Sequence, residues 1–257
     1  MSLNPKIRDW RGKTVWLVGA STGIGAALAK ALHERGARVA VSARSAQALQ
    51  AFADAHPGSL ALPLDVLDAG SVKQAFAELQ RHHSSLDFTL YCAGTYTPMR
   101  ADAFDLANAN HQWQVNYQGA LHWLDAALPA LLRQGHGHLS LVSSVAGYRG
   151  LPQALGYGPP KAALIHLAET LYLDLQPRGL AVSVVNPGFV ETPMTAQNRF
   201  DMPALIQPEQ AAEAMLAGYA AGEFSIHFPK RFTRLVGLLR HLPDALYFAT
   251  VRKGTRL

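Results

Sequence analysis

The chain has 257 residues, of which 49% are hydrophobic and 16% are charged, so it has the composition of an ordinary globular protein and can bury a large core. Its formal charge of +5 comes from mostly scattered Lys and Arg residues, and we therefore expect no nucleic-acid partner. Cys92 is the only cysteine, which excludes an intrachain disulfide, and no uncharged apolar run is long enough to cross a membrane. The first residues lack the pattern of a secretory signal, so we expect a cytoplasmic protein.

The predicted elements alternate between strands and helices along the chain. A short β-branched strand at 14–18 is followed by a glycine-rich turn and a helix at 24–35. Further strands are expected at 38–42, 60–64, 88–91, 138–142 and 181–185, with helices at 69–82, 104–133 and 160–176. This alternation predicts an α/β fold with a doubly wound parallel sheet, Rossmann-like, in a single domain over 1–257. Ligands of such folds bind at the carboxyl ends of the strands.

The turn after the first strand reads Gly-Ala-Ser-Thr-Gly-Ile-Gly over residues 19–25. Glycines at these positions allow a tight turn and let a pyrophosphate approach the start of the next helix, where backbone N–H groups attract an anion. A plain strand-to-helix connection is the alternative, but the position between a predicted strand and helix favours a nucleotide site. The predicted cofactor residues of this turn are Gly19, Ser21, Thr22, Gly23, Ile24 and Gly25.

Tyr157 and Lys161 are four residues apart near the start of the helix predicted at 160–176. Side chains at this spacing share a helical face, so the Lys161 ammonium could stabilise a Tyr157 phenolate. By itself the pair is a frequent coincidence. Pro159 and Pro160 stand between the two residues and lack an N–H group, which is harmless in the first turn of a helix but disruptive deeper inside it.

Together, Gly-x-x-x-Gly-x-Gly at 19–25 and Tyr-x-x-x-Lys at 157–161 resemble the motifs of the short-chain dehydrogenase/reductase family, over roughly residues 12–195. The family usually has Thr-Gly at the head of the glycine loop, where this chain has Val18-Gly19. The resemblance implies an NAD(P)-dependent oxidoreductase without a metal, in a homo-oligomer. It would transfer hydride between the nicotinamide and a carbonyl or alcohol substrate.

The resemblance also implies a catalytic group of four residues. Ser144, 13 residues before Tyr157, would hydrogen-bond the substrate oxygen, and Tyr157 would be the acid or base. Lys161 would lower the pKa of Tyr157 and bind the nicotinamide ribose, while Asn116 would hold a water that connects Lys161 to solvent. Taken singly, Asn116 could be a helix-interior amide, Ser144 a strand-end hydroxyl and Lys161 a solvated charge.

Two residues after strands bear on the adenosine half of the cofactor. The second strand ends in Ser42-Ala43-Arg44, and an Arg at this position suits the 2′-phosphate of NADP, so NADP(H) is the preferred cofactor and NAD(H) the alternative. The alternative is that Arg44 is an exposed loop residue without a role in binding. Asp65 corresponds to an acid that hydrogen-bonds the adenine in the family, or it could cap the next helix.

Two more segments match the family near the nicotinamide. The motif Asn-Asn-Ala-Gly appears as Tyr91-Cys92-Ala93-Gly94, which keeps the small residues Ala93 and Gly94 and loses both amides, while Cys92 reads as a buried strand residue. The loop at 186–192 would close over the nicotinamide through Pro187, Gly188, Val190 and Thr192.

The substrate and the tail are the least determined parts. A substrate loop is expected at 193–207, helped by 95–100 and 146–154, with apolar residues suggesting an apolar pocket, namely Phe189, Met194, Phe200, Met202 and Leu205. A basic amphipathic segment follows at 228–257, and we expect it to pack on its own domain or on a second subunit, with an anionic membrane surface as the alternative.

Two other functions stay open. The altered motif at Tyr91-Cys92 and the double proline are compatible with a catalytically silent nucleotide-binding sensor or scaffold of the same fold. Retention of all four catalytic residues argues against it. Isomerisation or dehydration is the other possibility.

Overall fold

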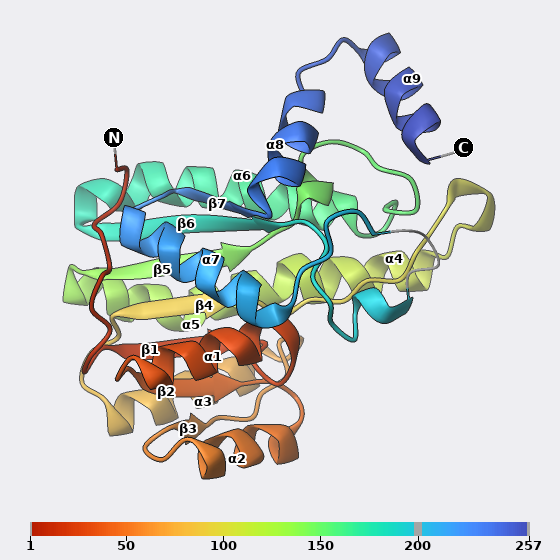
Figure 1. Cartoon of the computed structure of the whole chain (residues 1–257). Coiled ribbons are helices and arrows are strands. Elements are labelled where there is room, and N and C mark those ends of the chain that lie inside the picture. The colour runs from red at the N-terminus through yellow and green to blue at the C-terminus, as the bar shows by residue number, and fades with distance from the viewer. Residues whose placement is uncertain (1, 198–201, 256–257) are drawn as a thin grey trace.

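The computed structural model describes residues 2–197 and 202–255, and it contains a seven-stranded sheet in which every pair of neighbouring strands is parallel (Figure 1). The strand order is β3-β2-β1-β4-β5-β6-β7. The strands are β1 (Thr14–Val18), β2 (Arg38–Ser42), β3 (Leu60–Ala61), β4 (Phe88–Tyr91), β5 (Gly137–Val142), β6 (Leu180–Pro187) and β7 (Ser225–Phe228). The strand order reverses between β1 and β4, which places the ligand crevice at their carboxyl ends. The predicted doubly wound parallel fold is confirmed.

Helices cover both faces of the sheet, and each layer buries its own hydrophobic core. One face carries α3 (Ala69–His82), α5 (Gly119–Gln134) and α6 (Gly158–Leu175), which pack around the buried side chains of Trp16 and Trp123. The other carries α1 (Gly23–Glu34), α2 (Ala46–Ala55) and α7 (Pro208–Ala221), around Trp10, Phe88 and Tyr219. Because both faces are covered, all five residues of β1 are buried, which accounts for the four consecutive apolar residues that follow Thr14.

Two predicted elements differ from the structure. The strand predicted at 60–64 ends at Ala61 because Pro63 has no N–H group, although the Leu62 and Leu64 amides still donate to the carbonyl groups of Val41 and Ala43. The helix predicted at 104–133 is divided into α4 (Leu106–Trp113), the π-helical η2 (Gln114–Gln118) and α5, and the short 3-10 turn η1 (Ala101–Ala103) precedes it. The hydrophobic pattern of this segment does not reveal the π-helical turn. Such a turn contains one more residue than an α-helical turn, and the composition of the segment is the same in both cases.

The remaining helices lie at loops and at the C-terminus. Short 3-10 turns form η3 (Val145–Gly147), η4 (Gln176–Arg178) and η5 (Thr195–Gln197). The basic segment predicted at 228–257 starts within β7 and forms two helices, α8 (Lys230–Leu239) and α9 (Asp244–Thr255), which project beyond the edge of the sheet (Figure 1). Within residues 2–197 and 202–255, no helix is long and apolar enough to cross a bilayer. Phe200, one of the expected substrate-pocket residues, lies outside the described residues.

Candidate active site

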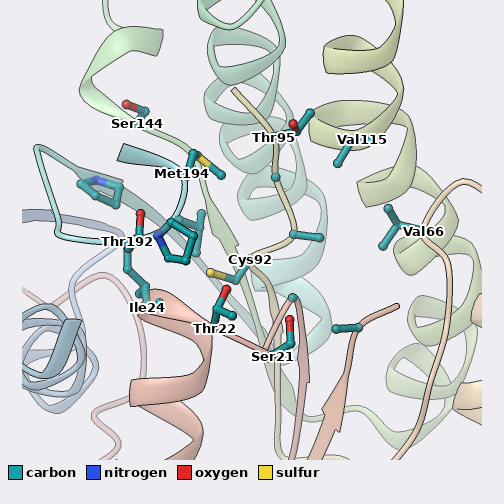
Figure 2. A pocket seen from close by; sticks show the side chains of 18 of the residues that line it. Ser21, Thr22, Ile24, Val66, Cys92, Thr95, Val115, Ser144, Thr192 and Met194 are labelled. Carbon is teal, nitrogen blue, oxygen red and sulfur yellow. The ribbon is translucent and has the colours of Figure 1, made fainter. Parts of the chain in front are cut away.

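A cavity of about 390 Å³ opens at the carboxyl ends of the central strands. Figure 2 shows Ser21, Thr22 and Ile24 of the glycine-rich turn at one end of it, with Ser144 and Thr95 toward the other. Nearly all predicted site residues line this cavity, namely Gly19, Ser21, Thr22, Gly23, Ile24, Arg44, Asp65, Ala93, Gly94, Ser144, Tyr157, Lys161, Pro187, Gly188, Val190 and Thr192. The two exceptions are Gly25 and Asn116, which do not line the cavity.

The glycine-rich turn crosses the end of β4 at very close range. Gly19 has a φ of +92°, and a Cβ atom on it would collide with the backbone of Ala93. A Cβ atom on Gly25 would collide with the carbonyl oxygen of Gly19, so Gly25 lets α1 pack onto β1 rather than lining the cavity. The side chain of Thr22, the N-cap residue of α1, makes no capping hydrogen bond. The start of α1 therefore presents backbone N–H groups and its positive dipole end to the cavity, as a pyrophosphate requires.

The two prolines between Tyr157 and Lys161 fall in the first turn of α6. Gly158 is the first residue of this helix and Tyr157 its N-cap, so Pro159 and Pro160 occupy positions whose N–H groups would have no partner within the helix. The Gly158 amide donates back to the carbonyl oxygen of Ala154 (2.6 Å), and the Lys161 amide makes the first bond of the helix itself, to the carbonyl oxygen of Tyr157 (3.3 Å). The prolines therefore leave the tyrosine and the lysine at the same cavity.

The environment of Tyr157 differs from the expectation. Burial raises the pKa of Tyr157, and a side-chain hydrogen bond with Ser144 only partly offsets this effect. The expected lowering of that pKa by Lys161 is absent, because the Lys161 Nζ lies 5.5 Å from the centre of the Tyr157 ring and donates to the carbonyl oxygen of Val142 (3.0 Å). Burial also lowers the pKa of Lys161 to about 8. The phenol is thus held in its protonated form.

The start of α6 is tied to the loop that carries Ser144. The Ser143 hydroxyl donates to the carbonyl oxygen of Lys161 (2.6 Å), and Gly147 lies so close to this backbone that a Cβ atom would be 2.8 Å from it. The Ser144 hydroxyl accepts from the amide of Ala146 (3.1 Å), which fixes the entry to η3. These contacts hold Ser144 and Tyr157 in one rigid unit.

Asn116 lies in the π-helical turn and is completely buried. Its Nδ2 donates to the carbonyl oxygens of Thr95 and Gln112 (2.8 Å each), and its Oδ1 accepts from the Thr95 amide (3.2 Å). A Cβ atom on Gly94 would be 2.9 Å from this Oδ1 and 3.5 Å from the Lys161 Nζ. Asn116 therefore fixes the chain that follows β4 and lies close to Lys161, with Gly94 between them.

Arg44 and Asp65 lie at the end of the cavity next to β2 and β3. Arg44 is exposed, follows the carboxyl end of β2 and lines the cavity beside Ser45, the N-cap residue of α2. The Asp65 Oδ1 accepts from the amide of Leu67 (3.0 Å), whereas the cap of α3 is Asp68. The helix-cap alternative for Asp65 is therefore wrong.

The loop after β6 closes the opposite side of the cavity. The Thr195 hydroxyl donates to the carbonyl oxygen of Val190 (2.6 Å), and the Thr192 amide donates to the Thr195 Oγ1 (3.0 Å). The Glu191 amide also donates to the carbonyl oxygen of Ile206, which links the loop to the end of the segment predicted as a substrate loop. Thr192 packs against the start of α1, where a Cβ atom on Gly23 would be 2.9 Å from its methyl group.

Several lining residues were not predicted as site residues. His111 and Val115, one helical turn apart on α4 and η2, line the cavity, as does Cys92, whereas the lining residues Thr95 and Met194 belong to segments expected to help form the substrate pocket. Val115 could have been found from its neighbour Asn116, and His111 from its i, i+4 spacing to Val115. The Cys92 thiol faces the cavity near Thr22 (Figure 2), where burial raises its pKa to about 11.

Known proteins resemble this chain over most of its length. A family model described as short chain dehydrogenase matches residues 13–203. An uncharacterized oxidoreductase of Myxococcus xanthus is 33% identical over 245 residues, which cover 94% of this chain and 97% of that protein. A crystal structure of a short chain dehydrogenase from Burkholderia cenocepacia in complex with NADP is 26% identical with a TM-score of 0.83, covering 95% of this chain and 98% of that one. A ribose-5-phosphate isomerase from Brucella melitensis is also 26% identical, with a TM-score of 0.78 and coverage of 85% and 92%. The chain therefore belongs to the short-chain dehydrogenase/reductase family of oxidoreductases.

Proposed function

We propose that this oxidoreductase uses NADP(H) to transfer a hydride between the nicotinamide and a carbonyl or alcohol substrate, with Tyr157 as the proton donor or acceptor. The observation that carries the proposal is the placement of Ser144, Tyr157 and Lys161 on the same cavity as the glycine-rich turn. The nicotinamide, when bound, supplies or accepts the hydride. The protein supplies the groups that orient the substrate and move the proton.

The protonation state of Tyr157 favours carbonyl reduction at neutral pH. Hydride addition to a carbonyl carbon develops negative charge on the oxygen, which needs a proton and hydrogen-bond donors. Burial raises the pKa of Tyr157 and keeps the phenol protonated, so its Oη is ready to donate, and the Ser144 hydroxyl can hydrogen-bond the same oxygen. Alcohol oxidation requires the phenolate and is therefore favoured by higher pH.

Lys161 and Asn116 would act on the nicotinamide side. The Lys161 ammonium is 3% exposed, faces Gly94 and would bind the nicotinamide ribose. Asn116 holds the backbone at Thr95 and lies close enough to Lys161 to keep a water that connects it to solvent. Tyr91 and Cys92 do not supply the amides of the family motif, but Asn116 fixes the chain after β4 from the other side.

The preference for NADP(H) rests on the end of β2. Arg44 presents a planar set of donors beside the hydroxyl groups of Ser21 and Ser45, and no acid follows the strand to repel a 2′-phosphate. The Burkholderia cenocepacia relative was solved with NADP. Asp65 would hydrogen-bond the adenine. NAD(H) is the weaker cofactor in this proposal.

The proposed homo-oligomer is supported by apolar side chains on the surface of α4, α5 and the turn before them. Phe104, Leu106, Trp113 and Leu121 are exposed there by between 39% and 62% of their surface. Exposed apolar groups of this size on neighbouring elements are typical of a subunit interface.

The function is tested by titrating the purified protein with NADPH and NADH and then assaying a panel of aldehydes, ketones and alcohols. The proposal expects tighter binding of NADPH and oxidation of NADPH coupled to formation of an alcohol. Tight NADPH binding without turnover of any substrate would instead indicate a silent sensor. Conversion of a sugar phosphate without net change in the cofactor would indicate an isomerase, the activity named for the Brucella melitensis relative.

A further inference from the structure

The two C-terminal helices carry an exposed apolar surface that nothing in the described chain covers. Leu235 and Leu238 of α8 are 59% and 68% exposed, and Leu246 and Phe248 of α9 are 57% and 53% exposed. The helices are held to the domain from their other sides, where Thr233 and Tyr247 are buried. We call Leu235, Leu238 and Phe248, with the basic residues one turn from them, Arg231, Arg234 and Arg252, the C-terminal face. Its projection beyond the body of the molecule is visible in Figure 1.

Basic residues alternate with the apolar ones on this face. Arg231, Arg234, Leu235 and Leu238 follow the spacing i, i+3, i+4 and i+7, so they share one side of α8. On α9, Phe248 is one turn from Arg252, whereas Leu246 is two residues from Phe248 and therefore lies on another side of the helix. The three basic side chains of the face, Arg231, Arg234 and Arg252, have no carboxylate partner within residues 2–197 and 202–255, and the one acid of the region, Asp244, pairs with Arg149.

We propose that the C-terminal face binds the surface of an anionic lipid bilayer. Apolar side chains flanked by Arg and Lys on an exposed helix match the boundary between acyl chains and acidic headgroups, where long basic side chains reach back to the phosphates. Neither helix spans the bilayer, so the face lies on the membrane rather than in it.

The charge distribution favours a bilayer over the other partners with an apolar or anionic surface. A second copy would bring another surface rich in Arg and Lys against this one, and like charges repel at such an interface. A nucleic acid would satisfy the basic residues but would leave Leu235, Leu238 and Phe248 exposed to water. An anionic bilayer can bury the apolar side chains and pair with the basic side chains at the same time.

The face is attached to both loops that border the reaction end of the cavity. The Phe232 ring of α8 packs against Phe189 (5.6 Å between centroids), next to Gly188 of the cavity wall. The Tyr247 Oη of α9 donates to the carbonyl oxygen of Gly150 (2.7 Å), on the loop that follows Ser144. A bilayer on the C-terminal face would therefore lie near the substrate entrance.

This position predicts a class of substrate, and that prediction rests on the proposed oxidoreductase function. An enzyme held at the bilayer surface by helices next to its entrance would take a carbonyl or alcohol that partitions into lipid, such as a long-chain aldehyde. A short, water-soluble aldehyde would react equally well on and off the membrane.

The docking is tested by co-sedimentation of the full chain with vesicles of phosphatidylcholine mixed with phosphatidylglycerol and with vesicles of phosphatidylcholine alone. We expect binding to the anionic vesicles only, weakened by salt. Arg231→Gln with Arg234→Gln should lower the partition coefficient about thirtyfold, since each basic residue near an anionic surface contributes about 1 kcal/mol. Leu235→Ser with Leu238→Ser should lower it more than about tenfold.

The matched control is Leu173→Ser, which removes a leucine that is 72% exposed on α6, away from the face, and should leave vesicle binding unchanged. Equal binding of the wild-type chain and both double variants would overturn the proposal. So would duplex DNA binding without vesicle binding, or dissociation of a dimer by the leucine pair without any effect on vesicles.

A second assay separates this inference from the proposed function. With NADPH, the leucine double variant should lose turnover of a long-chain aldehyde carried in anionic vesicles and keep turnover of a short soluble aldehyde. Loss of turnover of both aldehydes would contradict the explanation that the variant fails because it no longer binds the bilayer. Absence of any activity in the wild-type chain would refute the proposed function, while co-sedimentation would still decide the docking.

Discussion

The Lys161 ammonium lies 5.5 Å from the centre of the Tyr157 ring and donates its hydrogen bond to a main-chain carbonyl group, not to the phenol. The two side chains come from the same helix start and reach the same cavity, yet the pKa of each is dominated by its own burial. This arrangement keeps the phenol protonated and buries a charged amine. The buried ammonium should therefore lower the stability of the fold.

We expect Lys161→Met to stabilise the fold at pH 7 by about 2 kcal/mol, since burial of the ammonium costs more than its one hydrogen bond returns. The pKa of Lys161 in the folded chain, about 8, lies below the ordinary lysine value of 10.5, so the unfolded chain binds more protons between these values. Wild-type stability therefore rises from pH 8 to 10.5, and the advantage of the variant shrinks over this interval. Urea unfolding across this pH range measures the difference, with the exposed Lys30→Met as the control. A variant less stable than wild type at pH 7 would contradict this account of Lys161.

His138 makes the fold sensitive to acid. It is buried among Phe88 and Tyr219, its Nε2 is hydrogen-bonded to the Ser183 hydroxyl (2.9 Å), and burial lowers its pKa to about 3. Between the ordinary histidine pKa of 6.5 and about 3 the unfolded chain binds the extra proton, so this contribution to stability is complete above pH 6.5 and is lost as the pH falls.

His138→Gln keeps a donor for Ser183 and removes the titration. The free energy of unfolding of the variant should therefore fall less steeply below pH 6.5, by a slope approaching about 1.4 kcal/mol per pH unit. His166→Gln, at an exposed position of α6, should leave the slope unchanged. Identical acid slopes for wild type and His138→Gln would show that His138 is not the source.

Pro159→Ala should have little effect on catalysis. Pro159 is exposed in the first turn of α6, where its missing N–H has no partner to lose, so we expect kcat/KM to change less than about twofold. Stability should fall by about 0.5 kcal/mol, because the unfolded chain gains freedom. Pro129→Ala, in the interior of α5, should instead stabilise the protein because a helix-interior proline interrupts the hydrogen bonding. Thermal unfolding with steady-state kinetics measures both, and a large loss of activity in Pro159→Ala would show that the proline shapes the site.

Arg44→Ala should weaken NADPH binding about tenfold and leave NADH binding nearly unchanged, because a charged hydrogen bond to the 2′-phosphate is lost. Arg38→Ala is the matched control, since Arg38 is an exposed arginine at the opposite end of the same strand. Fluorescence titration with NADPH and with NADH gives two dissociation constants for each protein. An equal loss of affinity for NADPH and NADH would remove the basis for the cofactor preference.

Local signals were sufficient to predict the part of the fold that is proposed to bind the pyrophosphate. The strand, glycine turn and helix at 14–35 could be predicted because each element has its own pattern, and the two prolines could be weighed because their effect depends only on position in a helix. The π-helical turn at 114–118 could not, since it shifts Asn116 without altering the apolar spacing. The direction of the Tyr157 pKa shift also depends on burial by distant segments, which no motif encodes.

The C-terminal segment at 228–257 could likewise be predicted only in part. Its basic and apolar composition was evident in the sequence, but the break between α8 and α9 and the attachment of Tyr247 to Gly150 arise from tertiary contacts. The cavity-facing position of Cys92 was likewise hidden, because strand residues alternate in direction and the sequence alone does not tell where the strand ends.

The most direct test of the account compares Tyr157→Phe with the wild-type chain in NADPH-dependent reduction of a carbonyl substrate that the wild type turns over. Removal of the phenolic proton donor should lower kcat by about a thousandfold or more, while the dissociation constant for NADPH should stay within about twofold. A Tyr157→Phe protein that retains wild-type turnover would contradict the assignment of Tyr157 as the acid of this site.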